Sequence, residues 1–199
     1  MGRHGSDKGS KDITNSCHNY TTLYYSLLKD KQQTVKRVFE LGLGTTDTSI
    51  PNNMGPNGKP GASLRGWAEF FSLAQVFGAD IDRRILFTED RIKTYYCDQL
   101  NPIIIKEMWL NKDLVEGFDL ILDDGLHRYD ANICFLENSI HKLNPGGIYI
   151  IEDINNYNFA KFNEKLDEFK KLHPDLQYDL VTLPSTANKY DNRVLVITK

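Results

Sequence analysis

The sequence has no excess of positive charge and no long hydrophobic run. Its 199 residues include 24 Lys or Arg and 27 Asp or Glu, a formal net charge of −3, and the basic residues do not cluster. Because nucleic-acid binding normally relies on a basic surface, we predict no nucleic-acid partner. No apolar stretch approaches the ~20 residues of a membrane-spanning helix, and the first residues lack the apolar core of a signal peptide. We therefore predict no membrane partner.

Cysteine is also scarce. The three cysteines, Cys17, Cys97 and Cys134, are odd in number and share no Cys-x-x-Cys spacing. Such a set is typical of reduced thiols in the cytoplasm. We expect the three side chains to be buried or half-buried, and the protein to be cytoplasmic.

Internal repeats and low-complexity tracts are absent, and strand-like segments alternate with helix-like ones. Several strand-like segments are continuous apolar runs, as in strands buried on both faces of a parallel sheet. The predicted strands cover 35–41, 75–81, 94–97, 118–122, 147–151, 178–183 and 193–198. The predicted helices cover 16–28, 63–73, 102–115, 129–142 and 159–172. We predict one α/β domain over 1–199, a doubly wound, mostly parallel seven-stranded sheet that closes with an antiparallel hairpin.

Two segments stand apart from this alternation. Residues 45–62 are mostly turn formers without periodicity, and loops of that length in compact domains are usually functional or disordered. The loop follows the first strand directly, so we predict that it is a lid. Residues 1–34 precede the sheet, and we expect this helical segment to cover the ligand site.

A glycine-rich turn follows the first predicted strand, in the segment Glu40-Leu41-Gly42-Leu43-Gly44. Glycines let the backbone turn sharply and approach a ligand, which the N–H groups of a following helix can bind. The dinucleotide fingerprint Gly-x-Gly-x-x-Gly would need a glycine where Asp47 stands, which disfavours NAD. The turn alone indicates only a nucleotide-like ligand, with Glu40, Gly42 and Gly44 as candidate binding residues.

Polar residues follow the next two predicted strands: Asp80 and Asp82 after the second, Asp98 and Gln99 after the third. A carboxylate at the end of the second strand can accept hydrogen bonds from ribose hydroxyls. The third position suits the exocyclic amine of an adenine. Together with the glycine turn and the later segment Leu143-Asn144-Pro145-Gly146-Gly147, this ordered set resembles the class I methyltransferases that use S-adenosylmethionine (SAM). The resemblance implies SAM as the cofactor.

Two later strands end in paired acids, Asp123-Asp124 and Glu152-Asp153, and His127 lies just beyond the first pair. Neighbouring parallel strands open on one crevice, so Asp124, Glu152 and Asp153 can meet around a hard cation such as Mg²⁺. Methyl transfer to a hydroxyl requires removal of its proton. A cation can lower the hydroxyl's pKa, and an imidazole can accept the proton.

The motif Asp-Asp-Gly-x-His, followed by Glu-Asp after a Pro-Gly-Gly strand, resembles the metal-dependent sugar O-methyltransferases of macrolide and related antibiotic pathways. The cephalosporin-hydroxylase-like group shares the pattern. The segments Ser6-Asp7-Lys8-Gly9-Ser10, with Tyr20 and Tyr24 downstream, and Ala62-Ser63-Leu64-Arg65-Gly66-Trp67 extend the similarity over about residues 6–153. The resemblance implies that Asp124, Glu152 and Asp153 bind Mg²⁺ and that His127 is the general base. Leu126 stands where the family usually has serine, so the substrate could differ.

Alternatives stay open at these residues. His127 could cap the next helix, and Glu152-Asp153 could be a solvated strand end. Asp123 could replace Asp124 as metal ligand or contact the cofactor, because the register at a strand end is not fixed by sequence.

Other candidates lie outside the strand ends. Lys8, Ser63 and Arg65 are candidates for the cofactor site, and Ser63 and Arg65 lie at the start of a predicted helix. The two cations, Lys8 and Arg65, are candidate partners of the SAM carboxylate. Among the remaining histidines we single out His18, because the N-terminal motif could fold over the cofactor.

The leading hypothesis is a magnesium-dependent O-methyltransferase that acts on a small hydroxylated acceptor, such as a sugar or a sugar-bearing metabolite. One alternative acceptor is a phosphorylated or nucleotide-linked cell-envelope precursor, or a nitrogen atom. Another class of protein, non-catalytic SAM-binding or NAD-binding, is disfavoured by the acid–histidine set and the missing glycine. A core sheet uses most of the chain. We therefore expect the acceptor pocket to come from the N-terminal segment, the 45–62 loop or a neighbouring subunit of a homo-oligomer.

Overall fold

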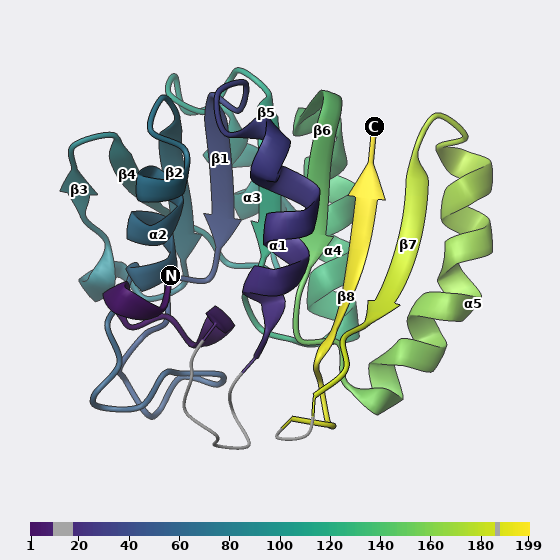
Figure 1. The fold of residues 1–199 in the computed structure, drawn as a ribbon, viewed down its shortest axis with the longest axis horizontal. Helices are drawn as coiled ribbons and strands as arrows, with labels where there is room; N and C mark the ends of the chain where they lie inside the picture. Colours follow the sequence, from purple (N-terminus) through teal and green to yellow (C-terminus); the bar gives the residue numbers. More distant parts are fainter. Residues whose placement is uncertain (10–17, 186–187) are drawn as a thin grey trace.

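A computed structural model describes residues 1–9, 18–185 and 188–199 and places one eight-stranded sheet at the centre of the molecule (Figure 1). The strand order is β3-β4-β2-β1-β5-β6-β8-β7. The strands are β1 (Arg37–Leu41), β2 (Gln75–Asp80), β3 (Thr88–Glu89), β4 (Ile92–Tyr96), β5 (Phe118–Asp123), β6 (Leu143–Ile151), β7 (Gln177–Thr182) and β8 (Arg193–Thr198). Strands β4, β2, β1, β5 and β6 are parallel, and β8 runs antiparallel to both β6 and β7.

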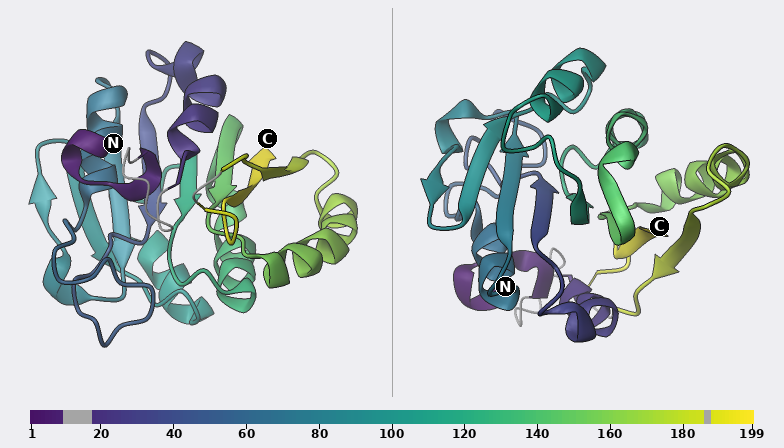
Figure 2. Two further views of the ribbon diagram at one scale, coloured as in Figure 1. Left: turned by 60° about the horizontal axis from the view of Figure 1, so that its bottom comes forward. Right: turned by 90° about the horizontal axis from the view of Figure 1, so that it is seen from above.

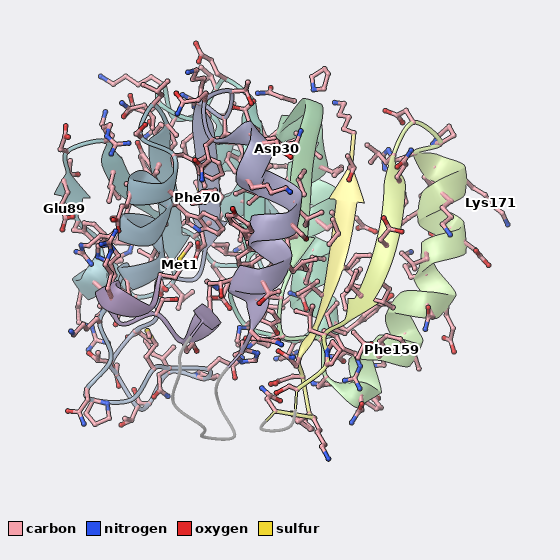
Figure 3. The ribbon with its side chains drawn as sticks, viewed as in Figure 1. Met1, Asp30, Phe70, Glu89, Phe159 and Lys171 are labelled. Atoms are coloured by element: carbon pink, nitrogen blue, oxygen red, sulfur yellow. The ribbon has the colours of Figure 1, made fainter. Side chains whose placement is uncertain are left out.

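The doubly wound, mostly parallel sheet with a C-terminal antiparallel hairpin is confirmed, but the predicted number of strands is wrong. All seven predicted strands are present, and β3 is an eighth, antiparallel to the start of β4 at the sheet edge. Figure 3 shows Glu89 of β3 at this edge, on the opposite side of the molecule from Lys171. Both residues of β3 are exposed, so no hydrophobic periodicity marks this strand in the sequence.

Helices cover both faces of the sheet, as Figure 2 shows from two further directions. The helices are α1 (Tyr20–Leu28), α2 (Ala62–Phe70), α3 (Pro102–Trp109), α4 (Tyr129–Ser139) and α5 (Asn156–Leu172). Three of them end earlier than predicted. At α3 the reason is local: the side chain of Asn111 accepts a hydrogen bond from the Asp113 N–H (3.0 Å) and closes a turn. The first residues of the predicted helix 16–28 lie outside the described residues.

Two hydrophobic clusters fill the space on the two faces of the sheet. One joins β1, β2 and β5 to α3, α4 and α5, and the other joins the same strands to α1 and α2. Because side chains alternate along a strand, Phe39 and Leu41 face the first cluster, whereas Val38 faces the second. Glu40 therefore points toward α1 and α2. This alternation determines toward which face of the sheet each acidic side chain at a strand end points.

The described residues contain no helix that is both long enough and apolar enough to cross a membrane.

The described cysteines carry free thiols, buried at Cys97 and half-buried at Cys134. Burial raises the pKa of Cys97, which keeps that thiol protonated. These two cysteines are thus buried or half-buried as predicted, and Cys17 lies outside the described residues.

Candidate active site

A cavity of about 950 Å³ lies at the carboxyl ends of the parallel strands. Figure 1 shows the N-terminal segment, the loop after β1 and the β7–β8 connection gathered at this end of the sheet. Residues from all of these segments line the cavity, together with residues that follow β2, β4, β5 and β6. The predicted site residues that line it are Lys8, Gly42, Gly44, Ser63, Asp80, Asp98, Gln99, Asp124, His127 and Asp153.

The glycine turn is fixed by a close approach between two backbones. Gly42 has φ 94° and donates its N–H to Ala79 O (2.8 Å), while the Asp124 N–H donates to Leu41 O (2.9 Å). A Cβ added to Gly42 would overlap the carbonyl of Asp124. A glycine at position 42 is thus needed for the backbone of Asp124 to pack against this turn.

Replacing Gly42 with alanine is therefore expected to destabilise the protein by about 2–4 kcal/mol, from the left-handed φ together with the overlap with Asp124. The matched control is Gly146→Ala, since Gly146 has φ 74° and a Cβ added there would meet no atom within 4 Å. Urea denaturation of both variants measures the difference. Equal losses of stability in the two variants would mean that the close approach of the Asp124 carbonyl to Gly42 does not contribute to the effect.

The side chains of Asp80 and Asp82 have different surroundings. Asp80 lines the cavity, and its carboxylate accepts the N–H groups of Leu43 (2.7 Å) and Asp82 (2.8 Å), so it holds the glycine turn. Asp82 is absent from the cavity wall and pairs with Thr45 (2.6 Å) and Arg84 (2.7 Å). The prediction that Asp82 contacts the cofactor is not supported by this position.

Asp98 and Gln99 both line the cavity at the end of β4. Asp98 caps the following turn by accepting the Leu100 N–H (3.0 Å). Gln99 donates to the carboxylate of Asp123 (2.7 Å) and accepts the Leu126 N–H (2.7 Å). Both polar atoms of the Gln99 side-chain amide are therefore hydrogen-bonded to residues at the end of β5 and in the loop that follows it.

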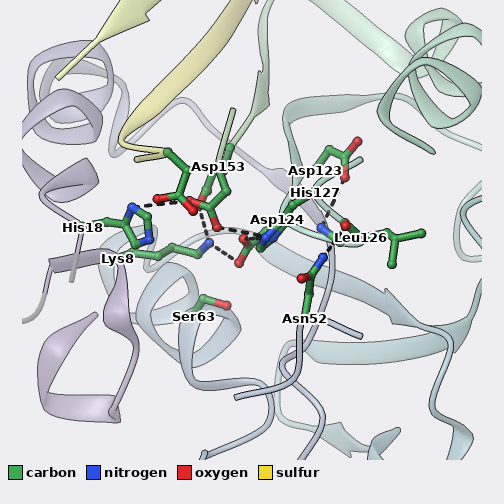
Figure 4. A network of polar contacts seen from close by, with 12 residues as sticks. Lys8, His18, Asn52, Ser63, Asp123, Asp124, Leu126, His127 and Asp153 are labelled. Atoms are coloured by element: carbon green, nitrogen blue, oxygen red, sulfur yellow. Dashed lines mark hydrogen bonds and ion pairs between the residues drawn. The ribbon is translucent and has the colours of Figure 1, made fainter. Parts of the chain in front are cut away.

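The structure shows toward which side Asp123 and Asp124 point at the end of β5. Asp123 is buried on the α3–α4 side, where Asn132 also donates to it (2.9 Å), and burial raises its pKa to about 6. Asp124, one residue later, points to the opposite side and into the cavity (Figure 4). Asp123 therefore supports the fold of this loop, and Asp124 is the acid available to a ligand.

Asp124, His127 and Asp153 come together on the cavity wall. The His127 Nε2 atom lies 3.2 Å from Asp124 Oδ1 and 3.3 Å from Asp153 Oδ2. Both His127 (φ 52°) and Asp153 (φ 55°) have left-handed backbones, which non-glycine residues adopt at a cost. Strained backbone of this kind concentrates at functional sites.

Glu152 and Glu40 form the inner part of the same acid cluster around Lys8. The Lys8 side chain is only 2% exposed, and its Nζ contacts Asp124, Glu152 Oε2 (2.5 Å) and, at 3.7 Å, Glu40 Oε1. Burial favours the neutral amine, but the three carboxylates outweigh it and raise the pKa of Lys8 well above its usual value. Glu40 and Glu152 are both absent from the cavity wall, and Glu40 also accepts hydrogen bonds from Ser63 and Trp67 (both 2.5 Å).

Two tyrosines of α1 complete the cluster. The Tyr20 hydroxyl donates to Asp153 Oδ1 (2.6 Å), and the Tyr24 hydroxyl donates to Glu152 Oε1. The sequence places these tyrosines one helical turn apart, so they share a face of α1. Their spacing and their place downstream of the Asp7-Lys8-Gly9 segment mark them in the sequence, but their partners lie more than a hundred residues later and have no local signal.

Arg65 has a different environment from the one predicted. Its guanidinium pairs with Glu89 (2.6 Å), lies over the Phe87 ring (4.6 Å) and is absent from the cavity wall. A contact with the SAM carboxylate is therefore not supported for Arg65. Lys8 does line the cavity, but its ammonium is already held by carboxylates.

The loop after β1 closes one side of the cavity. Ser49, Ile50, Pro51, Asn52, Asn53 and Met54 line it. The Asn52 side chain donates to the carbonyl of Leu126, which ties the loop to the segment that carries His127. The role as a lid stays a prediction.

The donor set suits a divalent cation. One ligand atom from each of Asp124, His127 and Asp153 lies within 4.8 Å of the others. Three carboxylates, those of Glu40, Asp124 and Glu152, contact the single ammonium of Lys8, and the carboxylate of Asp153 lies beside His127, which leaves an excess of negative charge in this group. Burial works to lower the pKa of His127, but Asp153 and Asp124 raise it to about 10. A hard cation that prefers oxygen ligands would offset this charge.

Solved methyltransferase structures have the same fold. The MycE methyltransferase of the mycinamycin biosynthetic pathway, solved with Mg and SAH, has a TM-score of 0.71 and 22% identity, over 100% of this chain and 53% of that chain. An O-methyltransferase from Bacillus cereus, solved with SAH, has a TM-score of 0.61 and 14% identity, over 89% of this chain and 81% of that chain. The fold is therefore the Rossmann-like α/β fold of the methyltransferases.

The sequence is related to sugar O-methyltransferases of antibiotic pathways. The 8-demethyl-8-alpha-L-rhamnosyl tetracenomycin-C 2'-O-methyltransferase of Streptomyces olivaceus is 28% identical over 166 residues, 83% of this chain and 39% of the relative. The demethylmacrocin O-methyltransferase of Streptomyces fradiae is 31% identical over 143 residues, 70% of this chain and 32% of the relative. No protein-family model matches. The chain thus spans about a third of the length of these relatives.

Proposed function

We propose that this protein is a SAM-dependent O-methyltransferase. The observation that carries the proposal is the Asp124–His127–Asp153 group on the wall of a cavity that the glycine turn also lines. Cofactor pockets typically measure ~300–1,000 Å³, and this cavity falls within that range. The names of the sequence relatives, all O-methyltransferases, support the same activity. In this proposal SAM binds between the glycine turn and the residues that follow β2 and β4.

We further propose that Asp124, Glu152 and Asp153 hold Mg²⁺ and that His127 is the general base. A cation bound there would lower the pKa of an acceptor hydroxyl that contacts it. Asp124 and Asp153 fix the His127 ring from two sides, which keeps Nε2 directed into the group. A cation bound to Asp124 and Asp153 would offset the two charges that raise the pKa of His127, so that its neutral imidazole would accept the hydroxyl proton. Bound SAM would supply the methyl group.

The proposed acceptor is a small hydroxylated molecule, and a sugar or sugar-bearing metabolite is the class that the relatives' names suggest. The alternative acceptor, a phosphorylated or nucleotide-linked precursor, has no support from the relatives. Cytoplasmic location and homo-oligomer formation stay predictions.

The test is methyl transfer from isotopically labelled SAM to a panel of glycosides, with and without chelator. We expect transfer with Mg²⁺, loss of at least about a hundredfold with EDTA, and recovery when Mg²⁺ is restored. Calorimetry with SAM and NAD is the accompanying binding assay. Binding of NAD without binding of SAM would overturn the proposal, and chelator-resistant transfer would overturn its magnesium component.

A further inference from the structure

A second group of polar side chains lies next to the proposed catalytic group. One ligand atom from each of His18, Asp153 and Asp191 lies within 4.8 Å of the others. Asp153 belongs to both groups, because its Oδ2 lies 3.3 Å from His127 Nε2 and its Oδ1 lies 3.3 Å from His18 Nδ1. The cavity wall therefore continues from the proposed base, across Asp153, to Asp191.

The protein holds this second group in place through the β7–β8 connection and α1. The buried side chain of Asn188 donates to Asp191 Oδ1 (2.8 Å) and accepts the Tyr190 N–H (3.1 Å). The Tyr20 hydroxyl contacts the Asp191 carbonyl (3.0 Å), and the Tyr20 ring stacks on His18 with centroids 4.5 Å apart. These contacts position the carboxylate and the imidazole before any ligand arrives.

Tyr190 lies at the rim of the cavity beside this group. Tyr190 is among the residues that line the cavity, it is 64% exposed, and it belongs to neither hydrophobic cluster. Its backbone is fixed at both ends, because Asn188 accepts its N–H and Arg193 Nη1 donates to its carbonyl (3.0 Å). The chain thus holds an uncovered aromatic ring at the entrance, although exposing such a ring has no benefit for folding.

An aromatic face next to a carboxylate and an imidazole matches the chemistry of a sugar. The C–H face of a pyranose ring can pack on an aromatic ring, and its hydroxyls are both donors and acceptors. Adjacent hydroxyls on a sugar ring are close enough for one to reach His127 while the next reaches the Asp191 side of Asp153.

We propose that Tyr190, Asp191 and His18 form the acceptor subsite. The sugar ring packs on Tyr190, the hydroxyl next to the methylated one binds Asp191 and His18, and Asp153 lies between the two hydroxyls. The substrate class is then a sugar with two adjacent free hydroxyls, of which one is methylated. This inference rests on the proposed function, and it concerns how the acceptor is selected.

The experiment measures acceptor binding rather than turnover. Methyl α-L-rhamnopyranoside and its monodeoxy analogues, each lacking one ring hydroxyl, are titrated into the protein with SAH and Mg²⁺ present, and binding is followed by NMR. We expect Tyr190→Ala to weaken binding of the parent glycoside roughly tenfold. The wild type should bind the parent glycoside more tightly than the analogue that lacks the hydroxyl next to the methylated one. Asp191→Asn should bind these two glycosides with equal affinity. The matched control is Tyr157→Ala, because Tyr157 is 72% exposed but does not line the cavity.

SAH and Mg²⁺ affinities, measured by calorimetry on the same variants, should equal those of the wild type. The proposal is overturned if both variants bind the glycosides as the wild type does, or if wild-type protein that binds SAH binds none of them. It is also overturned if Asp191→Asn loses Mg²⁺, since the group would then belong to the cation site. Failure of the wild type to bind SAH would instead overturn the proposed function.

Discussion

Replacing Asp153 with asparagine is expected to weaken Mg²⁺ binding by on the order of a hundredfold or more and to reduce methyl transfer to background. Asp153 carries one of the proposed ligand oxygens and lies 3.3 Å from the proposed base. Asparagine keeps the shape of the side chain but removes its negative charge. It also tolerates the left-handed backbone of Asp153 (φ 55°) better than most residues, so the fold should persist.

Titration calorimetry with Mg²⁺ measures the binding loss, and SAH affinity on the same sample reports whether the cavity is intact. Asp179→Asn is the control, because Asp179 is an exposed acid on β7 that does not line the cavity. Unchanged Mg²⁺ affinity and transfer in Asp153→Asn would contradict the placement of the cation at Asp124 and Asp153.

Replacing Lys8 with methionine is expected to lower the free energy of unfolding by about 3–5 kcal/mol. The ammonium compensates three carboxylates, of which those of Glu40 and Glu152 are buried, and methionine leaves them uncompensated. Urea denaturation measures the loss. Mg²⁺ should stabilise this variant more than it stabilises the wild type, because a cation that binds the folded state can replace part of the missing charge.

Two comparisons separate charge compensation from simple loss of packing. Lys29→Met, at an exposed lysine, should change the free energy of unfolding by less than about 0.5 kcal/mol. Adding Glu152→Gln to Lys8→Met should recover part of the stability, because it removes one of the uncompensated carboxylates. Fully additive losses in the double variant would show that Lys8 and Glu152 are not energetically coupled.

The fold could be predicted because its strands are encoded by local signals. The buried runs of β5 and β6 and the hairpin pattern of β7 and β8 are visible within a few residues of sequence. β3 could not be predicted in this way. Its two residues are exposed and pair with β4, and the Thr94 side chain donates to the Phe87 carbonyl (2.7 Å), which ties the segment before β3 to β4.

The candidate site was predicted where it depends on strand ends and missed where it depends on long-range contacts. Asp124, His127 and Asp153 follow parallel strands, and parallel strands end at one edge. The choice of Asp124 over Asp123 needs the register of β5, which the sequence leaves open. The partners of Lys8 lie 116 and 144 residues away, so its place among the carboxylates has no local signal. The pairing of Arg65 with Glu89 has no local signal for the same reason, because the two residues meet only through the fold.

A cation held beside His127 is the central element of the proposed function, and a crystal grown with SAH and Mn²⁺, with Mn²⁺ standing in for Mg²⁺, tests this directly. We predict an anomalous-scattering peak among the carboxylates of Asp124, Glu152 and Asp153, with SAH in the cavity next to the glycine turn. A crystal in which SAH fills the cavity and no peak lies at these carboxylates would contradict the account.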